Sequence, residues 1–107
     1  MTGKIDPKIL EEAVRRLVAG VKPEKIVMFG SQVWGDATEQ SDVDLLVIIP
    51  ESKISPAKRI MLALRCLRGL SFRKDILVKT RSEIDKYAKI TSSLEYLILK
   101  NGKVLYG

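Results

Sequence analysis

The feature that most constrains the fold is an apolar run of five residues, Leu45–Ile49, which follows a pair of acids and ends at Pro50. Consecutive side chains of a β-strand point to opposite faces of the sheet, so a strand that is apolar throughout must be covered on both sides. The run therefore predicts a central strand in a sheet with helices on its two faces. We expect an α/β (α+β) fold.

The rest of the chain supplies the other elements of such a fold. Short apolar runs predict three more strands, over 25–30, 73–80 and 103–107. Capping residues followed by apolar positions at helical spacing predict four helices, which begin after Asp6, Ser55, Thr80 and Ser92. The first of them should end at Gly20, and residues 31–35 should form a short helix or a turn. The prediction is a small mixed β-sheet with flanking helices.

Composition limits the chemistry that the chain can perform. Its 107 residues have the size of one compact domain, and we expect 1–107 to form it. It has no histidine and one cysteine, which excludes histidine bases, Ser-His or Cys-His nucleophiles and a structural zinc site. A metal would have to be a hard ion bound by oxygen atoms. Since there is no apolar signal segment, no membrane span and no possible disulfide within the chain, we expect a cytoplasmic protein.

The net charge of +6 admits an anionic partner, such as nucleic acid, a nucleotide or an acidic protein, or only a solvated surface. The cations are scattered and aromatic residues make up 6%, so we do not expect direct binding of nucleic acid. Four cations on the second long helix could meet an acidic partner, although we expect a solvated face; they are Lys58, Arg59, Arg65 and Arg68.

Asp42 and Asp44 are separated by a single residue at the start of the predicted central strand. Residues two apart on a strand share a face, so the two carboxylates should project together and repel each other. A Mg²⁺ ion, which binds carboxylate and phosphate oxygens, would relieve that repulsion. The pair is consistent with a nucleotide-binding metal site, but Asp42 could also simply end a turn.

Two other positions could complete such a site. Gly30 follows a predicted strand and lets backbone amides approach a ligand, and Ser31 adds a hydroxyl, although the pair is also common in ordinary turns. Asp75 begins another apolar strand. If that strand neighbours the central one, Asp75 could bind a metal or accept a proton at the same site. It could instead be an edge-strand charge that discourages aggregation.

Together, Gly30-Ser31, Asp42-x-Asp44 and the later Asp75 resemble the nucleotidyltransferase superfamily of DNA polymerase β. Within it the chain is similar to the minimal (MNT-type) nucleotidyltransferases over nearly its whole length, including GDATEQSDVDLLV and LEYLILKNGKVLYG. The resemblance implies the polymerase β palm-like nucleotidyltransferase fold, and an enzyme that uses ATP and two Mg²⁺ ions.

The resemblance also implies a role for each matching residue. Gly30 and Ser31 would hold the β- and γ-phosphates, Asp42 and Asp44 would bind the two Mg²⁺ ions, and Asp75 would bind the second ion and help activate the acceptor hydroxyl. That hydroxyl would attack the α-phosphorus and release pyrophosphate.

Trp34 departs from the family pattern, because many relatives carry Arg at this position. A cation near the phosphates is therefore missing in this chain. We expect Trp34 to pack in the core, with an apolar surface for a partner as the alternative.

Larger members of the superfamily carry an extra lobe for the nucleobase or acceptor, which a chain of this length lacks. The resemblance implies that a HEPN-domain toxin completes the site, and that this chain is its antitoxin, which transfers AMP to a toxin tyrosine. Two alternatives stay open: transfer to a small molecule such as an aminoglycoside, and a non-catalytic module that only binds the toxin. An oligomer formed through the C-terminal helices, Tyr96 or Tyr106 also stays open.

Overall fold

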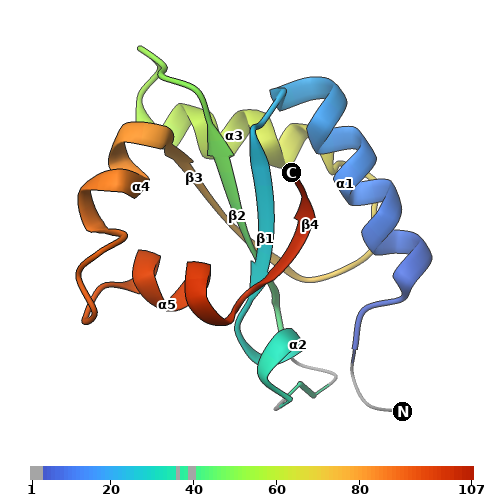
Figure 1. The fold of residues 1–107 in the computed structure, drawn as a ribbon. Coiled ribbons are helices and arrows are strands. Elements are labelled where there is room, and N and C mark those ends of the chain that lie inside the picture. The colour runs from blue at the N-terminus through green and yellow to red at the C-terminus, as the bar shows by residue number, and fades with distance from the viewer. Residues whose placement is uncertain (1–3, 36, 39–40) are drawn as a thin grey trace.

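The computed structural model describes residues 4–35, 37–38 and 41–107. A four-stranded sheet in the order β3-β2-β1-β4 forms its centre (Figure 1). β2 runs antiparallel to β1 and parallel to β3, and β4 is antiparallel to β1. The sheet is therefore mixed and β2 is central, which confirms the predicted fold class. The strand bounds are β1 Lys25–Phe29, β2 Val43–Ile49, β3 Lys74–Thr80 and β4 Lys103–Tyr106.

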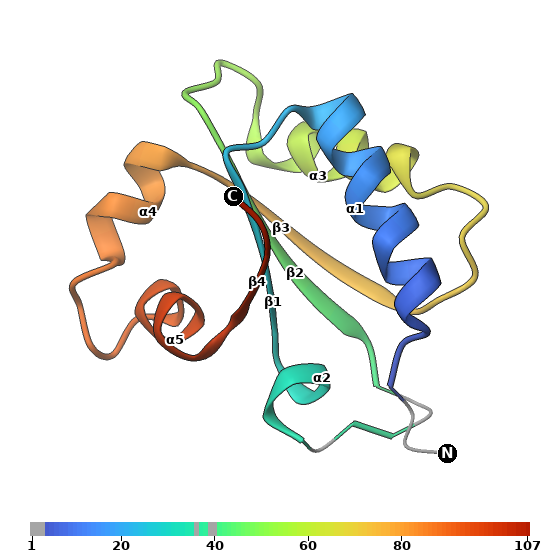
Figure 2. The ribbon, with the colours of Figure 1, turned by 45° about the vertical axis from the view of Figure 1, so that its right-hand side comes forward.

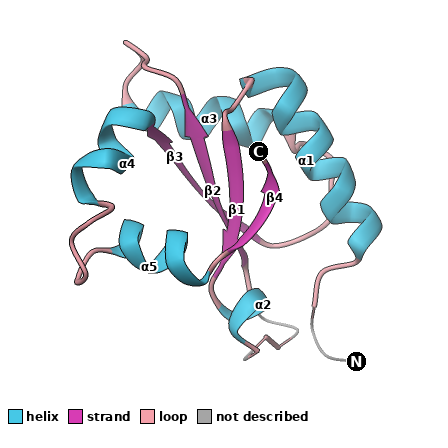
Figure 3. Cartoon of the chain, in the orientation of Figure 1, coloured by secondary structure: helices cyan, strands magenta, loops and turns pink. Residues whose placement is uncertain are grey.

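The helices cover the sheet from two sides. α1 and α3 lie on one face, α4 and α5 lie on the other, and α2 lies at one end (Figures 1 and 2). Figure 3 shows the same arrangement by element type, with the predicted order of helices and strands. None of the helices in the described part of the chain is long and apolar enough to cross a membrane. Their bounds are α1 Pro7–Val21, α2 Ser31–Trp34, α3 Pro56–Cys66, α4 Arg81–Tyr87 and α5 Leu94–Asn101.

Alternate side chains of β2 enter two separate apolar layers. Val43, Leu45 and Val47 belong to the cluster beneath α1 and α3, whereas Leu46 and Ile48 belong to the cluster beneath α4 and α5. All five side chains are buried, and four of them belong to the apolar run, which predicted their burial. The alternation also fixes the face on which the acids of this strand project.

Two predicted helix ends are displaced by one or two residues. α1 continues past Gly20 to Val21 and is closed by Lys22, whose φ is 55°. A side-chain carbon on Gly20 would lie 2.5 Å from Sγ of Cys66, so this glycine allows α1 to pack closely on α3 and does not end the helix. α5 is capped by Ser93 and not by Ser92.

Candidate active site

The paired strands bring two of the predicted site acids together at one end of the sheet. Asp44 is the second residue of β2, and its Cα pairs with Phe29 of β1 and with Asp75 of β3. Asp44 and Asp75 are each two residues before a leucine, Leu46 or Leu77, that packs beneath α4 and α5. Both carboxylates therefore project on that face. The condition set for Asp75, that its strand neighbours the central one, is met.

The environment of Asp44 makes its negative charge costly. The side chain is half-buried, whereas Asp75 is exposed. The pKa of Asp44 lies above its ordinary value, first because burial disfavours the charged carboxylate, and then because of the negative charges of Asp75 and Asp42. All three predicted acids are therefore close enough to interact, and a cation among them would lower the cost of ionising Asp44.

Gly30 forms the turn that closes against Asp44. Its φ of 78° and ψ of −157° lie in a region that essentially only glycine occupies. A side-chain carbon at this position would overlap Oδ2 of Asp44. Glycine is therefore required here for two independent reasons, backbone conformation and the close approach of a carboxylate.

Ser31 follows this turn as the first residue of α2, and the carbonyl oxygen of Gly30 accepts the N–H groups of Val33 and Trp34, both at 3.0 Å. The predicted phosphate-binding pair thus lies against the predicted metal-binding acids, although the two segments are separated in sequence. The roles of Gly30 and Ser31 toward phosphates stay predictions.

Asp42 lies just before β2 and forms an ion pair with Arg73, whose Nε is 3.0 Å from Oδ1 of Asp42. The backbone brings them together, because the N–H of Val43 donates to the carbonyl oxygen of Arg73 at 2.9 Å. We did not single out Arg73 from the sequence. The sequence feature that could have identified it is its position two residues before Asp75 in the predicted strand 73–80, which would put both side chains on one face.

The three acids suit a divalent cation in their chemistry but are not arranged as a complete site. Within residues 4–35, 37–38 and 41–107, no three acidic, histidine or cysteine side chains converge closely enough to hold a metal ion. Carboxylate oxygens are nevertheless the ligands that Mg²⁺ prefers, and the pKa of Asp44 is raised first by burial and then by the negative charges of Asp75 and Asp42. An ion bound by Asp42 would share or replace the contact of that carboxylate with Arg73.

The expectation that Trp34 packs in the core is wrong. Its side chain is 42% exposed, and Nε1 donates to the carbonyl oxygen of Asn101 at the end of α5 over 3.3 Å. The four-residue α2 instead turns Gln32 inward, where Oε1 accepts the N–H of Ile5 at 3.0 Å. A helix this short buries one side of a single turn, and Trp34 lies outside it.

The expectation of a solvated basic face on α3 also needs one correction. Arg59 is 8% exposed and its Nη1 lies 2.8 Å from Oε1 of Glu83 on α4. Lys58, Arg65 and Arg68 are exposed, as expected.

Comparison with known proteins agrees with this geometry. The model of the nucleotidyltransferase domain family matches residues 7–100. A Methanocaldococcus jannaschii protein named "Putative protein adenylyltransferase MJ0604" is 29% identical over 102 residues, covering 90% of this chain and 97% of that protein. The crystal structure of "a putative nucleotidyltransferase" from Sulfolobus solfataricus superposes with a TM-score of 0.59 and 26% identity, covering 74% of this chain and 70% of that one. This chain therefore belongs to the nucleotidyltransferase domain family.

Proposed function

We propose that this nucleotidyltransferase is Mg²⁺-dependent and moves AMP from ATP onto a hydroxyl of a partner protein. We further propose that the partner is a HEPN-domain toxin, that the acceptor is a tyrosine, and that the chain acts as the antitoxin. The observation that carries the enzymatic part is the pairing of Asp44 with Asp75 on adjacent strands, with the Gly30 turn closed against Asp44.

Each site residue would have a distinct task in the transfer. Asp42, Asp44 and Asp75 would hold two Mg²⁺ ions, which would supply charge neutralisation for the phosphates and a lower pKa for the acceptor hydroxyl. The Gly30-Ser31 turn would hold the β- and γ-phosphates.

The chemical step forms one bond and breaks another. The acceptor oxygen forms a bond to the α-phosphorus, the bond between the α-phosphorus and its bridging oxygen breaks, and pyrophosphate leaves with that oxygen. The exposed Asp75 is the side chain we assign to receive the proton of the hydroxyl.

Two observations support a protein as the acceptor. The M. jannaschii relative is named as a protein adenylyltransferase and is matched over 97% of its length. The exposed side chain of Asp75 also leaves the site accessible to an acceptor presented by another molecule. The antitoxin role rests on the resemblance to MNT-type proteins alone.

The distribution of charge disfavours a cationic small molecule, such as an aminoglycoside, as the acceptor. Residues 52–74 contain seven lysines and arginines and no acid, although the whole chain has 19 cations and 13 acids. This basic segment ends at the site, where Arg73 contacts Asp42. Arg73 therefore places one positive charge beside the acids, which disfavours a cationic substrate there.

A labelling assay tests the proposal. Purified protein, Mg²⁺ and ATP labelled at the α-phosphate are added to a lysate of the host and separated on a denaturing gel. We expect one labelled protein band with wild type and none with Asp44→Asn. Mass spectrometry of that band should identify a HEPN-domain protein that carries AMP on tyrosine.

The control is Asp85→Asn, the same change at an exposed acid of α4, which should label as wild type does. Label that appears only in small molecules would contradict a protein acceptor. Stable binding of a toxin without any transfer, from ATP or the other nucleotides, would contradict an enzyme and indicate a binding antitoxin.

A further inference from the structure

Four charged side chains occupy neighbouring positions where β2 and β3 begin. Asp44 and Asp75 are paired in register on β2 and β3, and Asp42 and Arg73 each lie immediately before one of these strands. The N–H of Val43 donates to the carbonyl oxygen of Arg73, so the strands are already joined at this earlier position. Three of these four side chains are acids, and the fourth, Arg73, carries a guanidinium group.

Arg73 supplies positive charge where the site is most negative. Its Nε lies 3.0 Å from Oδ1 of Asp42, and both side chains are partly accessible to solvent, at 61% for Arg73 and 41% for Asp42. Asp44 and Asp75, paired on the adjacent strands, add two more carboxylates nearby. By pairing with Asp42, Arg73 offsets part of that local excess of negative charge.

The same position conflicts with a bound divalent ion. A metal ion on Asp42 would be a positive charge a few ångströms from the guanidinium, and the two would repel. The planar set of donors of a guanidinium fits phosphate oxygens as well as carboxylates, so a phosphate can replace the carboxylate of Asp42 as a partner of Arg73. Position 34, in the short helix after the Gly30-Ser31 turn, holds a tryptophan, so this residue itself offers the nucleotide phosphates no cation.

We propose that Arg73 has two alternating partners: Asp42 in the metal-free protein and a phosphate oxygen of the nucleoside triphosphate in the loaded protein. This inference rests on the proposed function, because it requires a nucleotide at this site. Arg73 is then a positioning residue for metal loading and a binding residue for the substrate.

Substitution of Arg73 should change two affinities in opposite directions. In Arg73→Gln, Mn²⁺ without nucleotide no longer competes with a guanidinium, so its affinity should rise about threefold, the scale of an exposed ion pair. Affinity for the magnesium complex of α,β-methylene-ATP should fall at least about tenfold, the scale of a lost charge-assisted hydrogen bond. Electron paramagnetic resonance measures the first quantity and isothermal titration calorimetry the second, and neither requires turnover.

Arg81→Gln is the matched control. Arg81 also forms an exposed ion pair, with Nη2 2.7 Å from Oε2 of Glu24, but it lies at the opposite end of β3. The substitution changes the net charge equally, so both affinities should stay within about twofold of wild type. Arg73→Lys, which keeps the charge without the planar donors, should restore Mn²⁺ affinity and leave the nucleotide affinity lowered.

The outcomes separate the role of Arg73 from the proposed function. If Arg73→Gln weakened both affinities, Arg73 would have only a structural role and the inference would be overturned. An Arg73→Gln variant that changed neither affinity would overturn it as well. A wild-type protein that binds Mn²⁺ but no nucleotide would overturn the proposed function itself. Circular dichroism and thermal unfolding of each variant establish that it is folded before its affinities are compared.

Discussion

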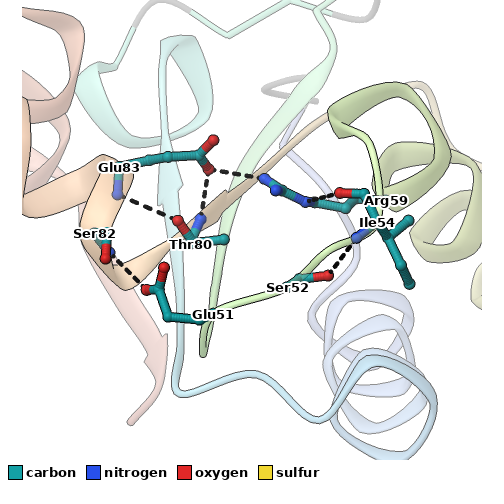
Figure 4. A network of polar contacts seen from close by, with 7 residues as sticks. All are labelled: Glu51, Ser52, Ile54, Arg59, Thr80, Ser82 and Glu83. Atoms are coloured by element: carbon teal, nitrogen blue, oxygen red, sulfur yellow. Dashed lines mark hydrogen bonds and ion pairs between the residues drawn. The ribbon is translucent and has the colours of Figure 1, made fainter.

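The two ends of the β-sheet hold their charged side chains under opposite conditions. At the end where β2 and β3 finish, the buried Arg59 donates to Glu83 at 2.8 Å and to the carbonyl oxygen of Ile54 at 2.9 Å, and the backbone N–H of Thr80 also donates to Glu83 (Figure 4). The pKa of Glu83 is held below its ordinary value, first by that backbone N–H and then by Arg59. At the end where β2 and β3 begin, the pKa of Asp44 is raised instead.

The difference shows which end is satisfied by contacts within the chain and which end is left with unfavourable negative charge. At the Glu83 end, the carboxylates of Glu83 and Glu51 accept hydrogen bonds from donors of the chain itself (Figure 4). Folding alone therefore supplies partners for both carboxylates. At the Asp44 end, two acids face each other across adjacent strands and Gly30 crowds the carboxylate. Folding there creates a repulsion that a ligand can relieve. The proposed Mg²⁺ site would relieve this repulsion.

Asp44→Asn should give the largest effect and separate the two properties. Label transfer should fall about a thousandfold, because a charged ligand at the reacting centre is lost. The melting temperature of the metal-free protein should stay the same or rise, because the amide removes a charge that burial and two acids disfavour. Transfer assays and thermal unfolding in EDTA measure the two quantities. A melting temperature several degrees below wild type would contradict the view that this end is strained.

Gly30→Ala should be the most destabilising single change at the Asp44 end. Its positive φ and the overlap with Asp44 together should cost about 3 kcal/mol of unfolding free energy. Gly35→Ala is the control, because Gly35 has a φ of 94° but its added carbon would meet nothing within 4 Å, and we expect about 1 kcal/mol. Urea unfolding of the two variants isolates the contribution of the contact with Asp44. Equal losses would show that the contact is unimportant.

The juxtaposition of the acids was predictable from sequence because it depends on strand periodicity. Asp42 and Asp44 are two residues apart, and the apolar run after them could belong only to a central strand. That Asp75 joins them required one further fact, the pairing of β2 with β3, which sequence alone left as a condition.

Other features depended on tertiary structure that no local pattern contains. The Arg73–Asp42 ion pair follows from the register of two parallel strands, and Arg59 is buried because α4 brings Glu83 to it. Gly20 has the pattern of a helix end, but the structure needs a glycine there because Cys66 of another helix packs against it. Trp34 was expected in the core by its residue type, yet the shortness of α2 leaves it exposed.

Arg59→Met should test the Glu83 end, where we expect a loss of about 2 kcal/mol. The change leaves the carbonyl oxygen of Ile54 without this donor, while Glu83 keeps the N–H of Thr80. Arg65→Met, at an exposed position of the same helix, should stay within about 0.5 kcal/mol of wild type. Urea unfolding measures both. If Arg59→Met matched Arg65→Met, the polar network in Figure 4 would not stabilise the fold.

The smallest effect, and the one that tests the comparison most directly, is the dependence of stability on pH. The ordinary carboxyl pKa of Asp44 is 3.8 and its folded value is higher, so above pH 3.8 the unfolded chain releases this proton more readily. Asp44 therefore lowers stability as pH rises from 3.8 through its folded pKa. The folded pKa of Glu83 lies below its ordinary 4.5, so its contribution is complete above pH 4.5 and is lost as pH falls through the folded value.

The contributions of Asp44 and Glu83 to stability should thus change in opposite directions with pH. A substitution at each residue removes its contribution. Relative to wild type in EDTA, Asp44→Asn should gain stability as pH rises from 3.8 toward neutrality, and the loss caused by Glu83→Gln should shrink as pH falls below 4.5. Urea unfolding across this range measures both differences. Saturating Mg²⁺ near neutral pH should cancel the advantage of Asp44→Asn, because an ion bound by the wild-type acids stabilises only the protein that can hold it. If the advantage persisted in Mg²⁺, the wild-type acids would not bind the ion, and the contrast between the two ends would not concern a cation.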